Sequence, residues 1–80
     1  MNVDDKIAET MSLIFGVPKA SIHEASSIDT ISQWDSIKHL ELVIGLEEAF
    51  GFQFEDDDVA ELLSFKLIRS IINEKLKGRV

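Results

Sequence analysis

Hydrophobic residues recur at helical spacing near the start of the chain. Four of them follow an i, i+4, i+7, i+8 pattern, which places them on one face of an α-helix. They are Ile7, Met11, Ile14 and Phe15. Asp4 and Asp5 suit the first turn, because carboxylates there interact favourably with the helix dipole, and Gly16 is a typical C-terminal stop. The pattern predicts a helix over about residues 4–15.

Residues 16–35 carry turn-forming residues without a regular period, and Pro18 prevents the first helix from continuing. Three isolated isoleucines, Ile22, Ile28 and Ile31, are spread along this segment. They predict a long crossover whose isoleucines contact a helical core while its polar residues face water. A short helical turn within the crossover is compatible with this pattern.

The next helical pattern covers residues 36–50, with Asp35 as N-cap and Gly51 as terminator. At about 100° per residue this helix has two apolar arcs. The arc expected to face the core contains Leu42, Val43, Leu46, Ala49 and Phe50. The second arc contains Ile37, Leu40, Glu41, Ile44 and Glu48. Because carboxylates and apolar groups share the second arc, this helix is more than a plain amphipathic surface helix.

Two further helices are predicted in the C-terminal part of the chain. The acidic run 55–58 suits the start of a short helix over about residues 56–63, and Ser64 can cap a last helix over about residues 65–76. The buried stripe of the last helix is expected to contain Phe65, Ile68, Ile71, Ile72 and Leu76. The whole predicts one all-α domain over residues 1–80, a four-helix bundle with three long helices, one short helix and a long first crossover.

Composition narrows the possible functions. Fifteen acidic residues against eight basic ones give a net charge of −7, which disfavours nucleic acid and favours basic protein surfaces as partners. The chain has no cysteine, so it forms neither a disulfide nor a thiolate metal site, and 80 residues leave little room for a large catalytic cavity. Neither a secretion signal nor a run long enough to span a membrane is visible. We therefore expect a cytoplasmic monomer without membrane insertion.

The candidate chemistry lies at Asp35-Ser36, the start of the second predicted helix. A serine hydroxyl there projects from a site where unpaired backbone amides and the helix dipole favour a phosphate. Ser36 is therefore a candidate attachment point for a phosphodiester-linked group. Taken alone, the pair is more typical of an ordinary helix cap than of an attachment site.

Three segments in this region carry a family resemblance. WDSI at 34–37, LELV at 40–43 and LEEAFG at 46–51 resemble the prosthetic-group segment of acyl carrier proteins. Length, acidity and the predicted helix order are similar as well. The resemblance implies that a phosphopantetheinyl transferase moves 4′-phosphopantetheine from coenzyme A onto Ser36. The arm's thiol then carries an acyl or aminoacyl group as a thioester, and the protein itself is not an enzyme.

The resemblance also implies a partner-binding surface for enzymes with basic patches, which load or transfer the acyl group. Asp35 flanks the attachment site, and the positions that match family contacts are Ile37, Glu41, Ile44, Glu47 and Glu48. Trp34 has two open roles: it either packs over the crossover or stands exposed as a partner contact. Short acyl chains are sheltered between the helices of family members, and Val43, Leu46, Ile68 or Ile72 are candidates for lining such a gap.

The sequence departs from the carriers of fatty acid biosynthesis at three positions. Lys38 stands where these carriers commonly have an acid, and Gln33 and Trp34 replace a glycine-containing lead-in. The Trp-Asp-Ser form resembles stand-alone carriers of specialised lipid, polyketide or related pathways. A peptidyl or aminoacyl carrier is an alternative.

Two other classes of function compete with a carrier. An unmodified acidic module would use the same exposed arc to bind a basic, amphipathic partner. A hydrolase triad of Asp35, Ser36 and His39 is rejected, because three residues within one helical turn cannot align as nucleophile, base and orienting group. The run 55–58 is interpreted as a solvated helix start, and His23 with His39 lacks further soft ligands, so no metal site is predicted.

Overall fold

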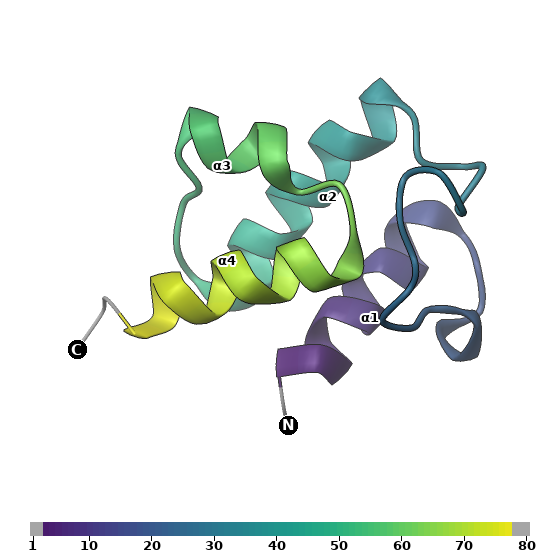
Figure 1. The fold of residues 1–80 in the computed structure, drawn as a ribbon, viewed down its shortest axis with the longest axis horizontal. Helices are drawn as coiled ribbons and strands as arrows, with labels where there is room; N and C mark the ends of the chain where they lie inside the picture. Colours follow the sequence, from purple (N-terminus) through teal and green to yellow (C-terminus); the bar gives the residue numbers. More distant parts are fainter. Residues whose placement is uncertain (1–2, 78–80) are drawn as a thin grey trace.

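The computed structural model describes residues 3–77, and over this range the chain is all-α (Figure 1). Its elements are α1 (Val3–Phe15), the 3₁₀ turn η1 (Lys19–Ser21), α2 (Ser36–Phe50), α3 (Asp56–Glu61) and α4 (Phe65–Lys77). Helix α1 contacts both α2 and α4, and α3 lies against α4. The predicted architecture of three long helices, one short helix and a long first crossover is confirmed.

Glycines in the left-handed backbone region end the first two long helices. Gly16 has φ 68° and Gly51 has φ 76°, conformations that residues with a Cβ rarely adopt. The amide of Gly16 donates to the Ser12 carbonyl (2.9 Å) and that of Gly51 donates to the Glu47 carbonyl (2.8 Å). Both predicted terminators are confirmed.

The core gathers the apolar faces of α1, α2 and α4, the residues that flank α3 and part of the crossover. Its buried residues are Ile7, Ala8, Met11, Phe15, Ile22, Trp34, Leu42, Val43, Leu46, Phe54, Leu62, Phe65, Ile68 and Ile72. Half-buried side chains such as Ile14, Phe50, Ile71 and Leu76 pack against this cluster. The core stripes predicted for α1, α2 and α4 therefore face inward, because turning any of these helices about its axis would expose its apolar stripe to water.

A small residue brings α1 and α2 close together. A Cβ atom on Gly45 would lie 3.2 Å from Cγ2 of Thr10 and 3.6 Å from Cδ1 of Ile14. The absence of a side chain at this position of α2 therefore allows the close approach of α1, which offsets the low helix propensity of glycine. Hydrophobic periodicity does not indicate this contact.

Helix α3 ends at Glu61 and not at residue 63, so it is two residues shorter than predicted. Leu62 leaves the helical conformation (φ −80°, ψ 60°), and its side chain is completely buried. The carbonyl of Leu63 accepts a hydrogen bond from the amide of Ile28 in the crossover (3.0 Å). Burial of the Leu62 side chain and the hydrogen bond between Leu63 and Ile28 thus outweigh continuation of the helix. Neither contact can be recognised from the local sequence.

The crossover is an ordered segment attached to the α3–α4 connection. In addition to the Ile28 bond, the amide of Phe65 donates to the Ser26 carbonyl (2.9 Å), and Ser27 forms an isolated bridge with Ser64. Ile22 is buried and Ile31 is half-buried, as expected. The expectation that Ile28 also packs into the core is wrong, because its side chain is 37% exposed.

Ion pairs join segments that are far apart in the sequence. Arg69 of α4 pairs with Asp4 at the start of α1 (3.0 Å) and with Glu24 in the crossover. Lys75 of α4 pairs with Asp58 of α3 (2.7 Å). The Lys75–Asp58 pair joins the short helix α3 to α4.

The substitution Asp58→Asn is expected to destabilise the protein at neutral pH more than at acid pH. The hydrogen bond from Lys75 holds the pKa of the Asp58 carboxyl below its ordinary value. The stabilisation is therefore fully present above the ordinary pKa and is lost as the pH falls through the lowered one. Urea unfolding followed by circular dichroism should show the difference between wild type and variant shrinking as the pH falls.

Asp57→Asn is the matched control, since it removes the same charge from an exposed position in the same turn of α3. In Asp58→Asn the side-chain amide oxygen can still accept the backbone hydrogen bond from Glu55, so this variant isolates the ion pair. An equal effect of the two variants at every pH would show that the Lys75–Asp58 pair does not stabilise the fold.

Candidate functional site

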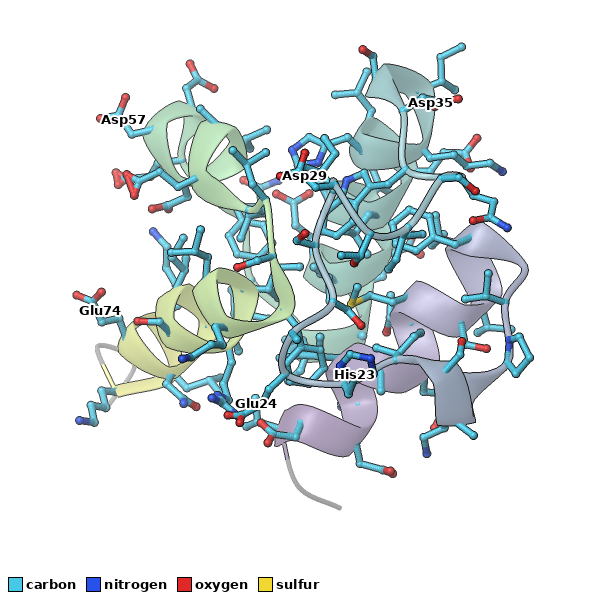
Figure 2. The ribbon with its side chains drawn as sticks, turned by 45° about the vertical axis from the view of Figure 1, so that its right-hand side comes forward. His23, Glu24, Asp29, Asp35, Asp57 and Glu74 are labelled. Atoms are coloured by element: carbon cyan, nitrogen blue, oxygen red, sulfur yellow. The ribbon has the colours of Figure 1, made fainter. Side chains whose placement is uncertain are left out.

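The site begins with the N-cap of α2. Asp35 has an extended backbone (φ −111°, ψ −173°), and its Oδ1 accepts a hydrogen bond from the amide of Lys38 (2.8 Å). This is the geometry of a helix N-cap, so the predicted role of Asp35 is confirmed. Figure 2 shows Asp35 at one end of the molecule, at the head of α2. The cap makes Ser36 the first residue of the helix.

Ser36 is exposed to solvent. Because the first amides of an α-helix have no partner within the helix, they and the helix dipole create a positive potential around this residue. An anionic group attached to the hydroxyl would be stabilised there. The side chain is thus accessible, at a helix end that favours an attached anion.

An apolar and acidic surface extends from Ser36 along α2. The exposed fractions of its apolar side chains are 70% for Ile37, 59% for Leu40 and 57% for Ile44. Glu41 and Glu48 are exposed on the same helix. The residues that the sequence placed on the second arc are therefore all at the surface, and we call these five residues the α2 surface.

Glu47 differs from its neighbour Glu48. Its side chain is half-buried, and its Oε2 accepts a hydrogen bond from the amide of Phe54 (2.9 Å). Glu47 therefore secures the turn that follows α2, a role that the sequence analysis missed. Two adjacent glutamates look alike in a sequence, and only the path of the chain after Gly51 distinguishes them.

Trp34 is a core residue, which corrects its assignment as a partner contact. Only 4% of its surface is exposed, and its ring lies 5.0 Å from that of Phe15 in α1. Of its two open roles, the structure shows a buried packing role, with ring contacts to Phe15 of α1 and His39 of α2. The indole packs between α1 and α2, so it does not reach an approaching protein.

His39 lies at the edge of the core, half-buried, and makes two hydrogen bonds. The Trp34 indole N–H donates to Nδ1 (3.0 Å), and Nε2 lies 2.8 Å from the carbonyl oxygen of Val59 in α3. A carbonyl can only accept, so Nε2 carries the proton and donates. The packing role expected for His39 is correct, but its bond to α3 was not foreseen.

A groove of about 630 Å³ opens beside Ser36, between α2 and α3. Its lining residues are Ile28, Asp35, Ser36, His39, Leu40, Asp56, Val59, Ala60 and Leu63. Apolar side chains predominate in this set, and carboxylates stand among them. The four residues considered for an acyl gap, Val43, Leu46, Ile68 and Ile72, are core residues instead and do not line this groove.

Residues 55–58 form the start of α3, where Asp58 accepts a hydrogen bond from the amide of Glu55 (3.0 Å).

Over residues 3–77, no group of three His, Cys, Asp or Glu side chains is arranged to hold a metal ion. Within the same range, no helix has the length and apolar character needed to cross a membrane.

A small acidic helical bundle with an exposed serine at a capped helix start, beside an apolar groove, has the features expected of a carrier domain. No family model matches the sequence. Curated relatives do match it over most of its length. The chain is 30% identical to the acyl carrier protein of Nitratidesulfovibrio vulgaris (strain Miyazaki F) over 76 residues, which cover 94% of this chain and 99% of the relative.

It is also 32% identical to the acyl carrier protein of Buchnera aphidicola subsp. Schizaphis graminum over 77 residues, which cover 95% of this chain and 96% of the relative. A second Nitratidesulfovibrio vulgaris acyl carrier protein, from strain DP4, is 31% identical over 67 residues, or 82% of this chain and 87% of the relative. The chain belongs to the acyl carrier protein family. Its role is therefore that of a carrier and not of an enzyme.

Two substitutions of Asp35 distinguish its role as the N-cap of α2 from the effect of its negative charge. Asp35→Ala is expected to lower the free energy of unfolding by about 1 kcal/mol, because the amide of Lys38 loses its acceptor. Asp35→Asn keeps an acceptor oxygen and should cost less than about 0.5 kcal/mol. Urea unfolding of the three proteins at one pH measures both values, and equal losses in the two variants would contradict the cap.

Proposed function

We propose that this protein carries an acyl group as a thioester on 4′-phosphopantetheine attached to Ser36 and delivers it between biosynthetic enzymes of the cytoplasm. The exposure of Ser36 at the capped start of α2, in a member of the acyl carrier protein family, carries the proposal. The chain has no cysteine. The group supplies a flexible arm and the thiol that the protein itself lacks.

The residues around Ser36 fit such a group. The hydroxyl offers the point of attachment, and the N-terminal end of α2 stabilises the phosphodiester charge. Asp35 stays next to it, with its Oδ1 accepting from the amide of Lys38, so the helix start is already capped before any group is added. A surface serine is a weak nucleophile, so the base and the divalent ion that activate it belong to the transferase.

The groove beside Ser36 supports an apolar cargo. Ile28, Leu40 and Leu63 contribute aliphatic lining, which is suited to a hydrocarbon chain. Asp35 and Asp56 place carboxylates at the same groove, which disfavours a cargo that ends in a carboxylate. The aliphatic lining therefore favours a hydrocarbon cargo of a specialised lipid or polyketide pathway. The alternative is an aminoacyl cargo, whose ammonium group the two carboxylates would attract.

The α2 surface supports docking by enzymes with basic patches. Ile37 and Ile44 provide a small apolar centre, and the exposed carboxylates of Glu41 and Glu48 set the charge around it. Charges at the rim of an interface mainly speed association, while a modest apolar area keeps dissociation fast. Rapid association and release suit a carrier that visits several enzymes.

Incubation with coenzyme A and a promiscuous phosphopantetheinyl transferase is expected to add one prosthetic group to the protein. Intact-mass spectrometry should show the added mass in wild type and not in Ser36→Ala, which lacks the hydroxyl. Ser32→Ala is the matched control, because Ser32 is also exposed and lies shortly before α2. It should be modified as fully as wild type.

An unmodified wild-type protein, under a transferase that modifies a known substrate, would contradict the proposal. The competing function, an unmodified module that binds a basic partner through the α2 surface, predicts that a Ser36→Ala allele restores a null phenotype. The carrier predicts that this allele behaves like the null.

Charge reversal on the α2 surface is expected to slow loading. Glu48→Lys should reduce the rate of prosthetic-group addition about threefold to tenfold at low ionic strength, with a smaller effect at high salt. Glu48 is a cleaner test than Glu41, which pairs with Lys38 (3.3 Å), or Glu47, which secures the following turn. Initial rates followed by mass spectrometry measure the effect.

Glu74→Lys makes the same charge change on an exposed residue of α4. Figure 2 shows Glu74 well away from the end of the molecule where Asp35 caps α2. If the two reversals slow loading equally, the effect reflects net charge and the α2 surface is not the docking site.

A further inference from the structure

Helix α3 is too short to hold its own position. It has six residues, and an isolated helix of this length is not stable in water. Its place therefore depends on contacts with its neighbours. On one side Lys75 of α4 pairs with Asp58. On the other side, facing α2, the carbonyl of Val59 meets Nε2 of His39 at 2.8 Å.

The side chain of His39 is held in place by Trp34. Its Nδ1 accepts the indole N–H of Trp34 (3.0 Å), and the two rings lie 6.2 Å apart with an interplanar angle of 21°. Trp34 is buried against Phe15 of α1. A buried indole N–H without an acceptor is costly, so the ring of His39 is fixed in position and in tautomer.

The resulting chain of hydrogen bonds, Trp34–His39–Val59, is called the His39 bridge. It joins the core to α3 across the wall of the groove. His39 and Val59 both line that groove, together with Ser36, which lies three residues before His39 on α2. The bridge therefore spans from α2 to α3 at the groove.

We infer that His39 is a positioning residue that fixes α3 against α2 and thereby holds the groove open for an uncharged acyl chain attached through Ser36. The part of the inference that concerns the acyl chain rests on the proposed function. Its structural part, the fixing of α3, concerns the unmodified chain as well. Loss of the bridge releases one side of α3, so the groove loses its defined width and holds the chain less well.

The unmodified protein provides the first test. His39→Leu keeps a side chain of similar size without hydrogen bonds, whereas the amide of His39→Gln can accept from Trp34 and donate to Val59. Hydrogen exchange of the α3 amides is expected to be about threefold to tenfold faster in His39→Leu, and within about twofold of wild type in His39→Gln. Exchange in α1 should be equal in all three proteins, which shows that the fold is intact.

If His39→Leu does not fold, a third variant provides the test. Trp34→Phe keeps an aromatic ring near Phe15 but removes the donor together with part of the indole volume, and it should speed exchange in α3 by a smaller factor. Trp34 is the single tryptophan, so its indole N–H gives one resolved NMR resonance. In wild type that proton should exchange slowly, and exchange as fast as in free tryptophan would overturn the inference.

The second test uses protein loaded with an octanoyl chain on the prosthetic group. In wild type the chain should shift the amide resonances of Val59, Ala60 and Leu63 and slow the cleavage of the thioester by hydroxylamine. His39→Leu should lose the shifts and react about threefold to tenfold faster, and His39→Gln should recover both properties.

The outcomes separate the two proposals. A wild-type chain that accepts no prosthetic group contradicts the proposed function, and the exchange experiment then still decides whether His39 fixes α3. Normal modification with identical exchange and cleavage in wild type and His39→Leu overturns the inference alone. A folded His39→Gln that behaves like His39→Leu also overturns it, because the hydrogen bonds would then not be what matters.

Discussion

The apolar contact between α1 and α2 sets the positions of the other elements of the fold. Ile7 and Met11 of α1 and Leu42 and Leu46 of α2 have no exposed surface, and Gly45 allows the two helices to approach closely. This contact fixes the rotation of α2 about its axis. Because 3.6 residues make one turn, burial of Leu42 and Leu46 turns the opposite side of α2 toward solvent.

The exposed apolar side chains of α2 follow from that constraint. Ile37, Leu40 and Ile44 stay in water because the core accepts only one arc of the helix. Their exposure is unfavourable for the isolated domain, and a patch of this kind is typical of a surface that binds a partner. The same rotation places Ser36 outside and His39 at the core edge, so attachment site, groove and α2 surface have a common origin.

The long crossover and the short α3 depend on each other. The crossover gains its order from backbone hydrogen bonds to residues 63–65, and its last part brings Trp34 beneath His39. Helix α3 in turn is held by His39 on one side and by Lys75 on the other. A domain with so few residues has a small core, and these polar contacts fix elements that apolar burial alone would leave loosely placed.

Local patterns specify the long helices of this protein and their inward faces. Spacing of apolar residues, the Asp35 cap and the glycines at 16 and 51 are sufficient for this, because these features act within a few residues of one another. They also bring Ser36 to a helix start and the second arc of α2 to the surface. A helix period and a cap are local properties, so the amino-acid sequence is enough to find them.

Long-range packing, in contrast, establishes the burial of Trp34, the role of Glu47, the end of α3 at Glu61 and the bond from His39 to Val59. Each of these depends on a contact with a segment that the local pattern does not specify. The indole is buried against Phe15 of α1, and the Val59 carbonyl lies twenty residues after its donor. Such contacts form when the helices pack, and no periodicity in the chain encodes them.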